Sequence, residues 1–208
     1  AEAGNYTVNA TAVTAANITR LPSVTYTGAS GGNWSVAGNW TSDEIGNPVG
    51  AIPDLANVQT VNIPTTKTVL FDMGSTVDVD AVTGAGTGKL TVSGAGTLTV
   101  AGAVNMPGYS QSNGILNTGS FTVTNDFNQT GGQINAGAGG VDITQSLAAG
   151  GLALGNIATS SSGALVINSA NDVTQTGALT IAGTVNLTAP NITLGSANVL
   201  GAVTVNAG

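Results

Sequence analysis

The 208-residue sequence contains neither cysteine nor histidine. Without histidine the chain lacks the commonest general base and metal ligand of enzymes. Without cysteine it lacks a thiol nucleophile, thiolate zinc sites and any disulfide framework. We therefore expect no cofactor and no transition-metal centre.

Positive charge is also scarce, because only Arg20, Lys67 and Lys89 are basic, and the formal net charge is -7. Three cations cannot neutralise a phosphate backbone, so nucleic acid is not expected as a partner. No apolar run approaches the roughly 18 residues that cross a bilayer, so we expect no transmembrane segment. Charged residues make up 6 % of the chain, well below the roughly 25 % of ordinary soluble domains.

Aliphatic residues, threonine, asparagine, glycine and serine fill the remaining positions. Hydrophobic residues reach 41 %, which is too many for a disordered chain. β-Branched residues favour strands, whereas glycine, asparagine and serine favour turns. From about Leu90 the sequence repeats an apolar, polar, apolar order in segments such as "LTV", "VDI", "LVI" and "VNL". This alternation is typical of strands with one buried face.

These short segments recur with a period of about 20 residues. A repeat of that length with three strands predicts one coil of a three-faced parallel β-helix, in which stacking of coils creates the core. An antiparallel sandwich does not require a constant period of this length. The chain is therefore predicted to be an all-β solenoid with about 20 residues per coil and an irregular N-terminal β cap. The expected row partners are Phe121, Phe127 and Ile134 with Val141, Leu147 and Leu152, then Leu165, Val173 and Leu179 with Val185, Ile192 and Val199.

The amino-acid composition and the regularity of the sequence change near residue 85. Residues 1–85 hold both tryptophans, four of the six prolines and most of the charge. We expect this part to form N-terminal strands, a tryptophan-containing cap and the first irregular coils. Residues 86–208 are expected to form the regular parallel β-helix.

Three stretches resemble bacterial surface proteins. "GNWSVAGNW" with "VQTVNIPTTKTVLFD" resembles the entry segment of β-helical surface proteins, and "FNQTGGQINAGAGGVDITQS" is similar to two-partner-secretion exoproteins of the filamentous-haemagglutinin type. "GNYTVNATAVTAANITRLP" looks like the last strands of the Ig-like repeats found in such adhesins. The resemblance implies a right-handed parallel β-helix within a large adhesin that is secreted or held on the bacterial cell surface.

Trp34 and Trp40 allow two interpretations. Exposed indoles would be candidate carbohydrate contacts, because sugars stack on aromatic faces. Buried indoles would instead cover the open end of the solenoid, where the first coil exposes apolar interior and unpaired strand edges. The pair precedes the first regular coil, which favours the cap.

The carboxylates of Asp72, Asp78 and Asp80 are the other candidate site. Asp78 and Asp80 alternate along "TVDVDAV", so we expect them on one face of a strand, where oxygen ligands suit calcium and paired carboxylates suit a glycosidase. A solvated outer face is the simpler interpretation. A polysaccharide lyase would also need basic residues, and only Lys67 and Lys89 lie nearby in the sequence.

The sequence thus favours a non-enzymatic structural or adhesive segment that forms a rigid rod for cell adhesion, aggregation or a biofilm matrix. Its expected partners are glycans, a host or neighbouring cell surface, or copies of itself. Two alternatives stay open. One is a self-assembling extracellular matrix fibre that exchanges its N-terminal strand, and the other is a carbohydrate-active enzyme on the same fold.

Overall fold

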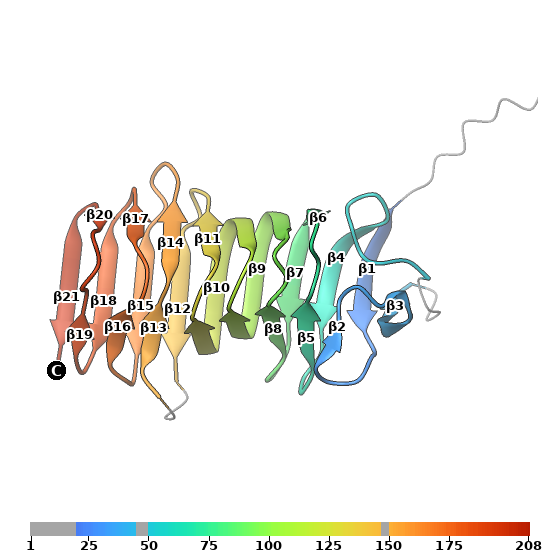
Figure 1. Ribbon diagram of the computed structural model, residues 1–208, viewed down its shortest axis with the longest axis horizontal. Coiled ribbons are helices and arrows are strands. Elements are labelled where there is room, and N and C mark those ends of the chain that lie inside the picture. Colours follow the sequence, from blue (N-terminus) through green and yellow to red (C-terminus); the bar gives the residue numbers. More distant parts are fainter. Residues whose placement is uncertain (1–19, 45–49, 147–149) are drawn as a thin grey trace, which may run out of the picture.

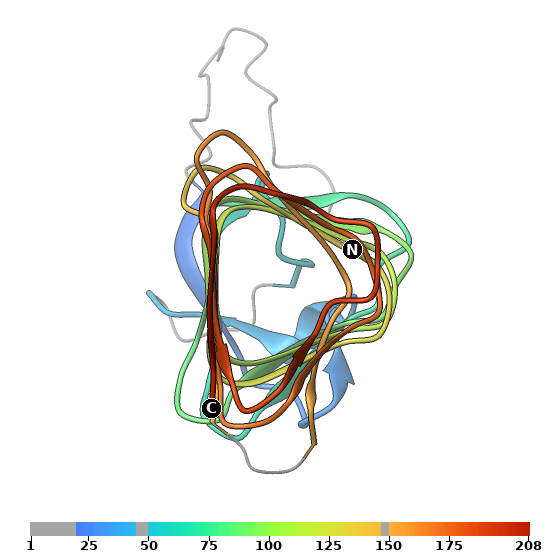
Figure 2. The same cartoon turned by 90° about the vertical axis from the view of Figure 1, so that its left-hand side faces the viewer.

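The computed structural model describes residues 20–44, 50–146 and 150–208. Within these ranges the chain is all β, apart from one 3-10 turn, η1 (Ala37–Asn39). No helix in this part of the chain is long and apolar enough to cross a membrane. Parallel coils stack into a β-solenoid of about seven turns with about 20 residues per turn, as the sequence period predicted. The molecule is elongated along the stack, and its coils superimpose on a roughly triangular outline (Figures 1 and 2).

One side of the triangle, face A, is a continuous ladder in which every coil contributes a parallel strand in register. The ladder passes residue 85 without a break, since that residue lies in the turn between β7 and β8. The strands of face A are β1 (Leu21–Tyr26), β4 (Val58–Ile63), β7 (Ala81–Gly84), the middle of β9 (Thr97–Gln111) and of β10 (Ile115–Gln129), β12 (Val141–Gln145), β15 (Leu165–Ser169), β18 (Val185–Ala189) and β21 (Val203–Ala207).

The other two sides are built in the same way. β9 and β10 are 15 residues long and continue round the corners, so each contributes to all three faces. Face B consists of β2 (Gly32–Asn33), β5 (Thr68–Phe71), β8 (Lys89–Val92) and the ends of β9 and β10, followed by a separate sheet of β13 (Leu152–Leu154), β16 (Val173–Gln175) and β19 (Ile192–Thr193). Face C consists of β6 (Val77–Val79), the starts of β9 and β10, β11 (Gln133–Ala136), β14 (Asn156–Thr159), β17 (Leu179–Ile181) and β20 (Val199–Leu200).

The core is made of rows of equivalent residues from successive coils. Because side chains alternate across a strand, every second residue points inward, and the next coil covers it about 4.8 Å away. Complete burial of one such aliphatic side chain contributes about 1.5–3 kcal/mol. One row of face A, with every member at most 2 % exposed, is Val24, Val61, Val82, Val104, Phe121, Val141, Leu165 and Val185.

Several expected row partners are confirmed. Phe121 pairs with Val141, Leu165 with Val185 and Val173 with Ile192. The first two pairs are buried throughout, and Ile192 is partly buried against the core. Leu179 is buried too, whereas Leu147 lies outside the described residues.

Two expected partners are wrong. Ile134 stacks on Ile157, whereas Leu152 belongs to face B and stacks on Val173. The cause is an extended coil, since Val141 and its partner Leu165 lie 24 positions apart. Val199 pairs with Thr180, one position after Leu179, and it is 68 % exposed, because a slip of one residue turns a side chain to the opposite face.

One corner of the triangle, between faces C and A, is made of stacked glycines. A Cβ added at Gly119 would lie 2.6 Å from the carbonyl oxygen of Gly102, and one at Gly137 would lie 2.9 Å from that of Gly119. These neighbours are backbone atoms of an adjacent coil and cannot rotate away. From Gly102 onward, a side chain at this corner would therefore clash with the backbone of the neighbouring coil, and glycine avoids the clash. The column consists of Gly102, Gly119, Gly137, Gly163, Gly183 and Gly201.

Candidate functional site

The N-terminal end of the stack is closed by the segment that carries both tryptophans. Trp34 directly follows β2, and Trp40 begins β3 (Trp40–Ser42), which runs antiparallel to β1 and pairs Trp40 with Tyr26. An antiparallel strand covers the outer edge of the first parallel strand and ends the ladder at that edge. Figure 1 shows this segment around β2 and β3, at the blue end of the stack.

Both indoles are fully buried, with 0 % exposure. Trp34 meets Trp40 edge to face at a centroid distance of 4.9 Å, and Trp40 meets Tyr26 in the same way at 5.2 Å. Trp34 also contacts Phe71 of the next coil at 5.5 Å. The four rings form one buried cluster at the N-terminal end of the stack.

Both ring nitrogens donate to backbone carbonyl oxygens. Trp34 Nε1 donates to the carbonyl oxygen of Pro53 at 3.2 Å, and Trp40 Nε1 donates to that of Trp34 at 3.0 Å. The arrangement expected of a cap, with buried rings and bonded nitrogens, is therefore present. Neither ring offers a face to a sugar, so the interpretation of Trp34 and Trp40 as a carbohydrate platform does not fit the structure.

A carboxylate fixes the cap to face A. Asp43, just after β3, accepts hydrogen bonds from the hydroxyls of Ser23 and Thr25 at 2.5 Å and from the amide of Asn62 at 2.8 Å. Burial alone raises the pKa of Asp43, but these three hydrogen bonds outweigh burial and hold the pKa below its ordinary value of 3.8. Asp43 thus joins β3 to both β1 and β4.

The three carboxylates singled out in the sequence do not meet at one site. Asp72 accepts hydrogen bonds from the backbone N–H and the hydroxyl of Ser35, and Asp80 pairs with Arg20 at 3.6 Å. Asp78 is exposed on the outer side of β6, between the inward Val77 and Val79. Among the described residues, no group of three or more acidic, histidine or cysteine side chains could hold a metal ion. The alternative in which Asp72, Asp78 and Asp80 jointly hold calcium therefore does not fit the described residues, and the exposure of Asp78 agrees with the simpler interpretation of a solvated face.

The outer surface of the solenoid carries columns of neutral polar side chains. In the first five coils of face A threonine and asparagine alternate, and the hydroxyl of Thr83 donates to Oδ1 of Asn62 at 2.7 Å. The column follows strand register, so its members are one strand spacing apart, about 4.8 Å. It consists of Thr25, Asn62, Thr83, Asn105 and Thr122.

A second column on face C lines a hollow of about 390 Å³. Thr99, Asn117 and Asn135 are in register there, and Nδ2 of Asn135 donates to Oδ1 of Asn117 at 2.9 Å. Within the described ranges, Nδ2 of Asn117 has no hydrogen-bond partner and is available to a ligand. The hollow is also lined by Gly119 and Gly137 of the glycine corner and by Ser160. None of the lining residues is charged.

Sequence reasoning did not single out Asn117 and Asn135. Both are outward residues that follow a buried aliphatic, and they lie 18 positions apart. Their recurrence at one coil offset was a signal that could have found them. Only tryptophan and aspartate, which commonly contact sugars and calcium, were considered as site residues, so the asparagine column was not identified.

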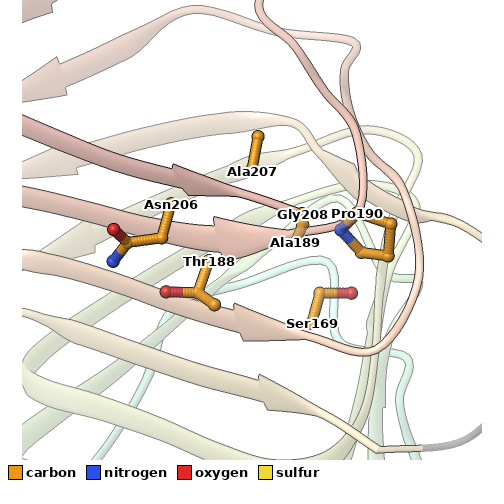
Figure 3. A pocket seen from close by; sticks show the side chains of 7 residues that line it. All are labelled: Ser169, Thr188, Ala189, Pro190, Asn206, Ala207 and Gly208. Carbon is orange, nitrogen blue, oxygen red and sulfur yellow. The ribbon is translucent and has the colours of Figure 1, made fainter.

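Two further hollows are lined by uncharged residues. One, of about 380 Å³, lies beside the ends of β15, β18 and β21 and is shown with its lining side chains in Figure 3. It is lined by Ser169, Thr188 and Asn206 together with alanine, proline and glycine. The other, of about 290 Å³, lies on face A beside Thr25, Asn62 and Thr83. Neither hollow is lined by an acid–base pair that could catalyse hydrolysis.

Comparison with known proteins gives one similarity. A family model described as repeats of unknown function (DUF5649) matches residues 138–206, which correspond to the coils from β12 to β21. No curated protein and no solved structure matched the chain. The match agrees with the repeated coil architecture, and the description of the family names no activity.

Proposed function

We propose that the chain is a non-enzymatic rod segment of a secreted or surface-attached bacterial protein, and that its outer polar columns bind neutral glycans. The bacterial surface context is carried over from the resemblance to filamentous-haemagglutinin-type exoproteins. The observation that carries the glycan contact is the face C column, where ordered amides and hydroxyls line a neutral hollow.

Binding of this kind depends on hydrogen bonds rather than on ring stacking. Every aromatic side chain in the described part of the chain is at most 1 % exposed, so no ring is available to stack on a sugar. Individual hydrogen bonds to a solvated sugar contribute little net free energy, about 0.5–1.5 kcal/mol each. A stiff ladder with a regular spacing compensates for the small free energy of each bond, because one long glycan can contact several coils at once.

The test is binding of the purified chain to beads coated with neutral polysaccharides. Asn117→Ala combined with Asn135→Ala is expected to weaken binding at least about tenfold, because both amides of the column are removed. Asn128→Ala, an exposed asparagine on face B, is the matched control and is expected to bind as the parent does. Equal binding by both variants would refute the assignment of the glycan site to face C.

Self-assembly into an extracellular fibre through exchange of the N-terminal strand stays a hypothesis. The N-terminal residues whose exchange was hypothesised lie outside the described residues.

A further inference from the structure

The chain contains a single Asn-Gly pair, formed by Asn113 and Gly114, which lies at the corner between faces B and C. The pair belongs to the short turn between Gln111, the last residue of β9, and Ile115, the first residue of β10. Gly114 has a positive φ of 67°, which glycine adopts readily. Asn113 is exposed, whereas Gly114 is buried. Water therefore reaches the carboxamide of Asn113, while the backbone that follows it is enclosed by the stack.

The side chain of Asn113 folds back on the peptide group that follows it. The backbone N–H of Gly114 donates to Oδ1 of Asn113 at 2.9 Å, and it has no backbone acceptor among the described residues. Because Cγ is bonded directly to Oδ1, the same contact holds the nitrogen of Gly114 close to Cγ. A nucleophile held beside the carbon that it attacks avoids most of the entropic cost of reaction.

We propose that Asn113 is a self-modification site, at which the chain converts this asparagine to an acid without an enzyme. The deprotonated nitrogen of Gly114 attacks Cγ of Asn113, the new C–N bond closes a five-membered succinimide ring, and the side-chain nitrogen leaves as ammonia. Water then opens the ring at either carbonyl carbon. One product is aspartate, and the other is isoaspartate, in which the backbone runs through the former side-chain carbonyl. Both products add one negative charge to the formal -7 of the chain. The proposal is independent of glycan binding.

The two products differ in their effect on the stack. The carbonyl oxygen of Asn113 accepts a hydrogen bond from Nε2 of Gln111 at 3.2 Å, and that of Gly114 accepts the backbone N–H of Gln133 in the next coil at 3.0 Å. On the other side, a Cβ at Gly114 would lie 2.4 Å from the carbonyl oxygen of Gly94. The turn is thus closely packed between two coils. Aspartate leaves its backbone unchanged, whereas isoaspartate inserts an extra carbon atom into the backbone and displaces these contacts.

The test is to age the purified chain at mildly alkaline pH and to locate the acid products by peptide mapping with mass spectrometry. Asn168 is the internal control, because it is exposed and precedes the small residue Ser169 but lies within β15, which is paired on both sides. Asn113 is expected to convert at least about tenfold faster than Asn168, since the nitrogen of Gly114 is held in place for attack. Conversion of Asn113 at the rate of Asn168, or no conversion, would overturn the proposal.

Two further measurements separate the role of the fold from that of the Asn-Gly sequence. A free peptide of residues 109–118 gives the rate that the sequence alone allows, and the folded chain is expected to react at least as fast. A slower reaction in the folded chain would overturn the proposal, because the fold would then protect the site.

The products are separated by ion exchange and melted beside the fresh parent chain. The isoaspartate form is expected to melt at a lower temperature, whereas the aspartate form, reproduced by Asn113→Asp, should melt as the parent does. Asn113→Gln should yield no acid product at this position, because its longer side chain cannot close a five-membered ring. An isoaspartate form that melts with the parent would refute the predicted effect on the stack.

Discussion

Trp40 donates its indole N–H to the carbonyl oxygen of Trp34 at 3.0 Å, and the two rings meet edge to face 4.9 Å apart. One tryptophan therefore holds the backbone of the other over the end of the first coil. This contact joins the residue that follows β2 of the solenoid to the first residue of β3 in the cap. The chain between them needs only the short η1 turn to reverse direction.

Truncation of either indole should destabilise the whole fold. Trp34→Ala or Trp40→Ala removes a fully buried ring, and large aromatic truncations in cores cost roughly 3–5 kcal/mol. Urea denaturation followed by far-UV circular dichroism measures the change. Val36→Ala lies between the two rings in sequence but is 47 % exposed, and should shift the free energy of unfolding by less than about 0.5 kcal/mol. A tryptophan variant as stable as the parent would refute the cap.

Substitution within the glycine corner should also destabilise the stack. Gly119→Ala places a methyl group 2.6 Å from the carbonyl oxygen of Gly102, and relief requires two coils to separate locally. Overpacking of this kind costs about 1–3 kcal/mol. Gly74→Ala is the control, because a Cβ there meets no atom within 4 Å. Thermal melts of the two variants should differ clearly, and coincident melting curves would contradict the account of the corner.

Stability should fall in acid partly through Asp43. Its pKa is lower in the folded chain than in the unfolded one, so its contribution is complete above about pH 4 and disappears as the pH falls through the folded value. Asp43→Asn should therefore be less stable than the parent at about pH 7, with a smaller loss on acidification. Melting temperatures measured across this pH range provide the check, with the exposed Asp142→Asn as control. If the melting temperatures of the parent and of Asp43→Asn fell equally with acidification, the proposed stabilisation by the ionised Asp43 would be refuted.

The fold could be predicted from the sequence because the same period is repeated many times. Alternating strands 20 residues apart can bury their apolar side only by stacking, so Phe121 with Val141 and Leu165 with Val185 followed from spacing alone. The prediction of row partners failed where the number of residues per coil changed. The coil between Val141 and Leu165 is longer than its neighbours, and an expected offset near 20 therefore matched Ile134 with Leu152 instead of Ile157.

The candidate site was harder to predict. Trp34 and Trp40 were recognisable as a cap because an open solenoid end must be covered, whereas the contacts of Asp43 depend on three strands far apart in the sequence. The columns on faces A and C arise from register between coils, and no short motif encodes register. Asp78 and Asp80 do alternate as expected, but Asp80 follows the end of β6 and pairs with Arg20.

The central claim is that this rod holds glycans without cleaving them. The most direct measurement incubates the chain with one neutral polysaccharide and records both the bound fraction and the release of new reducing ends. We predict binding that weakens in the Asn117→Ala, Asn135→Ala double variant, with no release of reducing ends by any form of the protein. Release of reducing ends by the parent chain, abolished by Asp78→Asn or Asp80→Asn, would contradict the account and identify an enzyme.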